Sequence, residues 1–152
     1  MLFLIMTVIV FNLFAYYIRK RLKPIEIITT TLFAMYFQVM TDIYLDLRYD
    51  FYGYFEKGPD YESLLYVFGI YPAVNIIFLN LYPYQKPWQS KLYFLVGCLL
   101  FAVVLEKLYI WSGTFYYNGW KIYYSLFLYP FIFLTLVGFH QIVLYFLKKE
   151  SK

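Results

Sequence analysis

The sequence predicts an all-α fold, a polytopic membrane protein with a bundle of five transmembrane helices, and three observations lead to it. Hydrophobic residues make up 63% of the 152-residue chain and charged residues only 14%. In an average soluble domain, nearly half of the residues are hydrophobic and about a quarter are charged. The apolar residues gather in five stretches, each near the roughly 20 residues that a helix needs to cross the hydrocarbon core. The segments between them alternate between basic and acidic. We therefore expect one transmembrane helical domain over residues 1–152.

The first apolar stretch ends in a cluster of positive charge. Residues 1–18 contain no charged side chain, and four Lys or Arg residues follow within residues 19–23. A secretory signal peptide has the opposite order, with positive charge before its apolar region. We therefore expect an uncleaved anchor whose N-terminus lies outside and whose basic flank lies in the cytoplasm. The five expected spans are residues 2–18, 25–47, 64–81, 92–111 and 122–147.

The remaining charges agree with this orientation. Nine of the 13 Lys and Arg residues fall in the segments expected inside, which are residues 19–26, 82–91 and 148–152. Because cytoplasmic Lys and Arg set the orientation of membrane proteins, we expect the N-terminus outside and the C-terminus inside. The same charges explain the pI of about 9.0 without a nucleic-acid partner. The expected partner is the lipid bilayer of the cell membrane, and a second candidate partner is another membrane protein.

Four ionisable residues inside the expected spans form the candidate polar site: Asp42, Asp46, Glu106 and His140. Ionisable groups in a bilayer are costly and normally face the bundle interior, which makes each a candidate for function. At 1.5 Å per residue, Asp42 lies about 25 Å and Glu106 about 22 Å above the inner ends of their helices. We expect these two carboxyls to meet, facing inward, in the outer third of the bundle and to share a proton or a cation. His140 is expected roughly 10 Å or more from them along the membrane normal.

Simpler roles remain open for the same residues. Solvation at the membrane interface also explains carboxylates at this depth, and a hydrogen bond to a neighbouring helix explains His140. Asp42, Asp46 and Asp50 share one helical face that could hold a hard cation through oxygen ligands. A solvated acidic face gives the same spacing, so we expect no metal site. The single cysteine, Cys98, lies mid-span and is interpreted as a packing residue.

Two prolines lie inside expected spans at similar depths. Pro72 and Pro130 are each preceded by tyrosine, Tyr71 and Tyr129, in helices that run in the same direction. Each proline frees a backbone carbonyl and is expected to kink its helix. The shared Tyr-Pro pair also suggests a parallel repeat of two helical hairpins, formed by the second and third spans and by the fourth and fifth.

Motifs with a known mechanism are missing from the sequence. It has no glycine-rich phosphate loop, no HExxH, no paired CxxC and no GxSxG. Nucleotide hydrolysis, zinc proteolysis and α/β-hydrolase chemistry therefore have no support. With one histidine and one cysteine, a nitrogen- or sulfur-rich metal site is excluded as well. We expect no cofactor.

Several features follow one another in a recognisable order. Asp42 lies late in the second span, the third span carries a proline, and Glu106 precedes an aromatic outer loop that ends in residues 117–120, Tyr-Asn-Gly-Trp. Residues 124–125 open the last span and His140 lies towards its end. This order resembles a family of small, uncharacterised five-helix membrane proteins common in endospore-forming, low-GC Gram-positive bacteria. The resemblance implies a five-helix architecture and a cell-membrane location, and it implies no activity.

Two functions of different classes are compatible with these observations. The first is a non-enzymatic binding or partner subunit of the cytoplasmic membrane, and this is the function that we expect. The alternative is a small transporter-like or membrane-embedded enzymatic protein that uses the acids Asp42 and Glu106. Acids that face a cavity favour the second function, and acids at the lipid interface favour the first.

Overall fold

The computed structural model describes residues 1–18 and 21–150 and contains five α-helices in that part of the chain. The all-α prediction is confirmed. Two short strands and two π-helical segments, η1 and η2, were not expected; η1 continues the second helix and η2 leads into the third. The elements are α1 (Leu2–Tyr17), α2 (Pro24–Asp42), η1 (Ile43–Arg48), β1 (Tyr52–Tyr54), η2 (Leu65–Ile70), α3 (Tyr71–Leu81), α4 (Trp88–Trp111), β2 (Phe115–Tyr117) and α5 (Ile122–Glu150).

The helix ends follow local rules of the sequence. α2 begins at Pro24, and α4 begins directly after Pro87. Proline favours the start of a helix, because its φ is already close to the helical value and because a backbone N–H in the first turn would have no partner within the helix. α4 therefore starts four residues before the expected position 92. It ends before Gly113, whose φ of 72° lies in the left-handed region that terminates helices.

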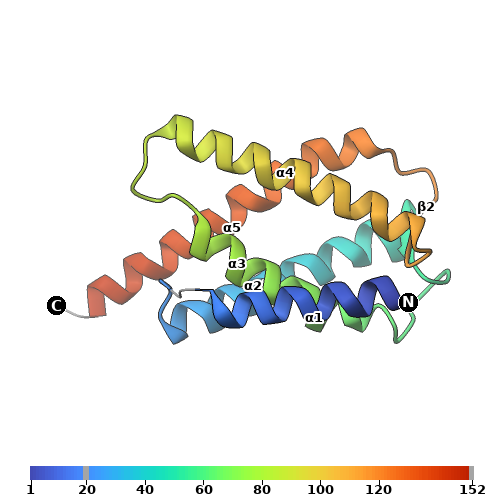
Figure 1. Cartoon of the computed structure of the whole chain (residues 1–152), viewed down its shortest axis with the longest axis horizontal. Coiled ribbons are helices and arrows are strands. Elements are labelled where there is room, and N and C mark those ends of the chain that lie inside the picture. Colours follow the sequence, from blue (N-terminus) through green and yellow to red (C-terminus); the bar gives the residue numbers. More distant parts are fainter. Residues whose placement is uncertain (19–20, 151–152) are drawn as a thin grey trace.

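The five helices form an open arc (Figure 1). Along the arc, α1 packs on α3, α3 on α2, α2 on α5 and α5 on α4. Its two ends, α1 and α4, approach each other through two pairs of aromatic rings, one near the end of the bundle that holds the N-terminus and one near the middle of both helices. The ring centroids of Phe3 and Tyr109 are 5.5 Å apart, and those of Phe11 and Phe101 are 6.2 Å apart. Side chains thus bridge α1 and α4 near the outer end of the bundle, which is the end where the N-terminus lies. The C-terminus lies at the opposite end (Figure 1).

A two-stranded antiparallel sheet joins the two loops at the outer end. β1 and β2 pair with Tyr52 opposite Tyr117 and Gly53 opposite Tyr116. A Cβ on Gly53 would overlap the Tyr116 ring, so any larger residue here would force that ring to move. The backbone N–H groups of Asn118 and Trp120 donate to the carbonyl of Phe51, at 2.8 and 2.9 Å. These bonds hold together loops that are about sixty residues apart in the chain.

Two helices of the described chain, α4 and α5, are long and apolar enough to cross a membrane. The expectation of five such helices is met only in part. α1 and the continuous helix Leu65–Leu81 are apolar but shorter than 18 residues, and α2 carries more polar side chains, including Glu26, Gln38 and Asp42. Of the basic residues expected inside, Arg19, Lys20 and Lys152 lie outside the described residues.

Candidate functional site

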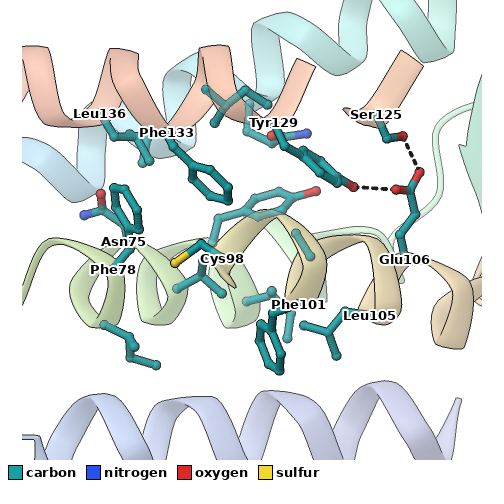
Figure 2. A pocket seen from close by; sticks show the side chains of 18 of the residues that line it. Asn75, Phe78, Cys98, Phe101, Leu105, Glu106, Ser125, Tyr129, Phe133 and Leu136 are labelled. Atoms are coloured by element: carbon teal, nitrogen blue, oxygen red, sulfur yellow. Dashed lines mark hydrogen bonds between the residues drawn. The ribbon is translucent and has the colours of Figure 1, made fainter. Parts of the chain in front are cut away.

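Glu106 is the centre of a hydrogen-bonded cluster at the outer end of the bundle. Its side chain is buried on α4, and three hydroxyl groups from other parts of the chain donate to its carboxylate. Tyr117 from β2 and Ser125 from α5 donate to Oε1, at 2.6 and 2.8 Å. Tyr129, also from α5, donates to Oε2 at 2.9 Å (Figure 2). The carboxylate therefore ties α4, β2 and α5 together.

Asp42 occupies a similar position at the end of α2. Its Oδ1 accepts hydrogen bonds from the amide of Gln38 at 3.1 Å and from the hydroxyl of Tyr52 at 2.8 Å. The hydroxyl of Tyr54 lies 3.3 Å from both carboxylate oxygens. The Tyr71 hydroxyl is 2.8 Å from that of Tyr54, so it extends the network to α3.

The tyrosines of the sheet act as hydrogen-bond donors because they keep their protons. Burial raises the pKa of Tyr52 and of Tyr54 above the ordinary value, and the charge of Asp42 raises both further. Burial also raises the pKa of Tyr117, and its hydrogen bond to Glu106 adds to the effect. A protonated phenol is the form that can donate to a carboxylate.

The two acid clusters are arranged like the halves of a repeat. In each half, a helix brings an acid to the outer end, a strand tyrosine binds that acid, and the tyrosine of the Tyr-Pro pair joins the network. The strand register is symmetric, because Tyr52 pairs with Tyr117 and Tyr54 with Phe115. Any antiparallel pair of strands shows this exchange of partners, so the parallel repeat suggested by the sequence stays a prediction.

The sequence predicted that the carboxyls of Asp42 and Glu106 meet and share a proton or a cation. In the structure, each carboxylate has its own set of hydrogen-bond partners. Both acids are held at the outer end through paired strands, and no hydrogen bond of the described chain joins their carboxylates. A proton shared between them would need such a bond. Because hydroxyl donors already satisfy both carboxylates, the structure gives each acid its own partners.

Asp46 lies in η1, one turn beyond Asp42, and is also buried. The charges of Asp50 and Asp60 in the outer loop act on it, and Asp50 pairs with Lys57. Among the described residues, no group of three or more His, Cys, Asp or Glu side chains could hold a metal ion. The three aspartates that share a helical face in the sequence therefore do not converge as a cation site.

His140 lies at the inner end of the bundle, away from the other candidates. Its Nε2 is 3.1 Å from Oε2 of Glu26 on α2, and its Nδ1 is 2.6 Å from the hydroxyl of Tyr84. Glu26 and His140 are 5% and 2% exposed, so they form a buried pair. The hydrogen bond between them joins α2 to α5 in the interior of the bundle.

The sequence placed Glu26 in the cytoplasmic loop and did not identify it as a site residue. It lies in the first turn of a helix, where an acid is ordinary because it complements the helix dipole. Near Glu26 in the chain, only the buried Thr30, one turn later on the same helix, marks this helix face as buried. Recognition of the pair required the contact between α2 and α5, which are more than a hundred residues apart.

A cavity of about 710 Å³ lies inside the arc of helices. Its walls are almost entirely apolar and aromatic, with a few polar groups that include Gln38, Asn75, Ser125 and Glu106. Figure 2 shows Asn75 and Phe78 from α3 beneath Phe133 and Leu136 from α5, with Glu106 at the far end. The volume falls within the usual range for small-molecule sites.

The two prolines occupy different positions in their helices. Pro72 is the second residue of α3, where the winding changes from π to α, and Pro130 lies inside the continuous helix α5. A π-helical segment is a common device for absorbing an irregularity in helix geometry. The preceding tyrosines, Tyr71 and Tyr129, both line the cavity.

In comparisons with known proteins, no protein family, curated protein or solved structure matches this chain. Its function therefore has to be inferred from the geometry of its own residues.

Proposed function

We propose that this chain is a non-enzymatic binding protein of the cytoplasmic membrane that takes an apolar lipid chain into the cavity between its helices. The observation that carries the proposal is the apolar cavity of about 710 Å³. Its side opening lies between α1 and α4, the two ends of the arc. An apolar cavity that opens to lipid is filled by apolar chains at little cost, because it offers the same environment as the bilayer.

The opening lies in the inner half of the bundle. α1 and α4 run in opposite directions, and the ring contact of Phe11 with Phe101 sets their relative depth. Phe14 on α1 therefore lies close to the depth of Gly97 on α4, below that contact, while Val10 lies level with the contact and Tyr93 about one turn below Gly97. All four residues line the cavity. The side chains of Val10, Phe14 and Tyr93 are also exposed on the outer surface. An acyl chain in the membrane would therefore reach the cavity without crossing a polar surface.

The acids have a structural role in this proposal. Glu106 and Asp42 are saturated by hydroxyl donors and hold the strand pair over the outer end of the bundle. A transport or catalytic site would need a carboxylate that is free to exchange its partner. Glu106 lines the cavity, which by itself favours the transporter-like alternative. Its carboxylate is already bound by three hydroxyl donors, however, so the binding function is favoured.

The proposal includes five membrane spans with the N-terminus outside and the C-terminus inside. Four helices, α1, α2, α4 and α5, carry exposed apolar side chains along their length, whereas α3 exposes only Leu81. Such exposed apolar side chains are the pattern of a surface that faces lipid. The sheet and the N-terminus lie at one end and the C-terminus at the other (Figure 1). The resemblance to the five-helix membrane family supports the same architecture.

Reporter fusions test this topology. We expect alkaline phosphatase to be active when inserted in the outer loop at Lys57 and inactive when fused at Lys152, because the enzyme folds only outside the cytoplasm. Green fluorescent protein at the same sites should give the opposite result. Active phosphatase at Lys152, or a fluorescent fusion at Lys57, would overturn the proposed orientation.

Carbene labelling tests the binding of a lipid chain. The purified protein is reconstituted in nanodiscs with a phospholipid that carries a diazirine in one acyl chain, and labelled residues are mapped by mass spectrometry. We expect labels on Phe78, Phe133 and Leu136, which are buried in the bundle and line the cavity. Leu134 and Ile142 on the outer surface of α5 report ordinary contact with lipid.

A pair of glycine variants provides the matched control. Gly97 lines the cavity at its opening and Gly138 does not, and a Cβ at either position meets no atom within 4 Å. We expect Gly97→Phe to reduce labelling of the three interior residues about tenfold, whereas Gly138→Phe leaves it unchanged. Both variants should keep the outer labels on α5. The proposal fails if the interior is unlabelled in the unaltered protein, or if both variants reduce its labelling equally.

A further inference from the structure

One polar atom in the wall of the cavity has no partner. Asn75 on α3 is 1% exposed and lines the cavity. Its Nδ2 donates to the hydroxyls of Thr30 and Thr31 on α2, at 3.2 and 3.3 Å. Its Oδ1 is buried and accepts no hydrogen bond from the described part of the chain. Such an atom costs about 1–3 kcal/mol unless a donor reaches it.

The orientation of this amide is determined by its neighbours. Thr30 donates its single hydroxyl proton to the backbone carbonyl of Glu26 at 2.7 Å. The oxygen of Thr30 can therefore only accept from Asn75, which places Nδ2 on the side of α2. The carbonyl oxygen Oδ1 is left as the acceptor. Rotating the amide would set two acceptors against each other and would not remove the unpaired atom.

The surroundings of Asn75 decide what kind of donor can reach it. The neighbouring wall is aromatic and aliphatic, with the rings of Phe78 and Phe133 stacked at 5.0 Å. Asn75 lies six residues before the inner end of α3, or about 9 Å from it, and Gly97 lies nine residues, or about 14 Å, from the inner end of α4. A ligand at this position must be apolar along its length, and a charged group would be strongly disfavoured.

We propose that the cavity selects long-chain lipids that carry a neutral hydroxyl group, which donates a hydrogen bond to Oδ1 of Asn75. This inference rests on the proposed function, because it assigns a preference among the apolar molecules that the cavity admits. The hydroxyl of such a molecule is also costly to bury in the bilayer unless it is bonded. One hydrogen bond therefore satisfies two groups that are otherwise unpaired, and it favours the alcohol over an analogue that cannot donate.

Competition between two matched probes tests the preference. 1-Hexadecanol and its methyl ether have the same chain, and only the alcohol can donate a hydrogen bond. Each competes with the diazirine phospholipid for labelling of Phe133 and Leu136, with concentrations expressed per mole of membrane lipid so that partitioning is taken into account. A neutral hydrogen bond has a net value of about 1 kcal/mol, so we expect the alcohol to compete about fivefold better than the ether.

A variant of the acceptor provides the second measurement. Asn75→Leu has a similar volume and no acceptor, so it should abolish the difference between alcohol and ether while the interior labelling persists. If this variant does not fold, the competition between alcohol and ether in the unaltered protein still tests the hydroxyl preference. Equal competition by the two probes would overturn the hydroxyl preference and leave the lipid-binding function standing. An unlabelled interior would instead overturn the proposed function itself, so the two failures are distinguishable.

Discussion

Replacement of Glu106 by leucine is expected to destabilise the protein by about 3 kcal/mol. The substitution keeps the apolar bulk but removes the acceptor of three hydroxyl groups, from Tyr117, Ser125 and Tyr129. Each buried hydroxyl that loses its partner costs about 1 kcal/mol or more. The free energy of unfolding is measured in mixed micelles by titration with sodium dodecyl sulfate, followed by far-ultraviolet circular dichroism.

Two further variants control this experiment. Glu106→Gln keeps an oxygen that can accept from Tyr117 and Ser125, so it should lose less than half as much stability as the leucine variant. Glu56→Leu alters an exposed acid of the outer loop and should change the free energy of unfolding by less than about 0.5 kcal/mol. If Glu106→Leu costs no more than Glu56→Leu, the carboxylate does not hold the outer end together.

The buried pair at the inner end should show strong coupling between its two members. We expect Glu26→Leu to cost about 3 kcal/mol, because it leaves Nε2 of His140 without its hydrogen-bond partner in the protein interior. The double variant Glu26→Leu/His140→Leu removes both polar groups and should be more stable than Glu26→Leu alone by about 1 kcal/mol or more. The same unfolding titration measures both variants.

A double-mutant cycle makes this prediction quantitative. With His140→Leu as the third variant, the coupling energy should exceed about 1 kcal/mol, as it does for groups in direct contact. Glu150→Leu at the exposed end of α5 serves as the control for loss of a negative charge and should leave the free energy of unfolding nearly unchanged. If the losses of Glu26→Leu and His140→Leu simply add, the two side chains are independent and the pair has no structural role.

Much of the fold could be predicted from local sequence. The boundaries of the helices follow from long apolar stretches, from prolines that start helices and from glycines that end them, such as Gly113 after α4. These signals act within a few residues along the chain. The strands β1 and β2 gave no such signal, because each has only three residues and is stabilised by pairing with the other.

The candidate site could be predicted only in part. The cost of burying a carboxylate singled out Asp42 and Glu106 without any knowledge of the fold. Their partners were missed, because Tyr54 and Tyr117 come from two loops that meet only through the pairing of β1 with β2. Glu26 was missed because an acid in a first helical turn is usually explained by the helix dipole.

The sequence by itself determined the all-α class, the approximate helix boundaries and the candidate acids, since each depends on the composition of a single segment. Only the tertiary structure decided which groups satisfy those acids, where His140 finds its carboxylate, and that an apolar cavity with one unpaired acceptor, Oδ1 of Asn75, lies inside the arc. These features depend on contacts between segments far apart in the chain. Apolar composition can be read from each helix separately, whereas the pairing of the few polar side chains depends on how the helices pack.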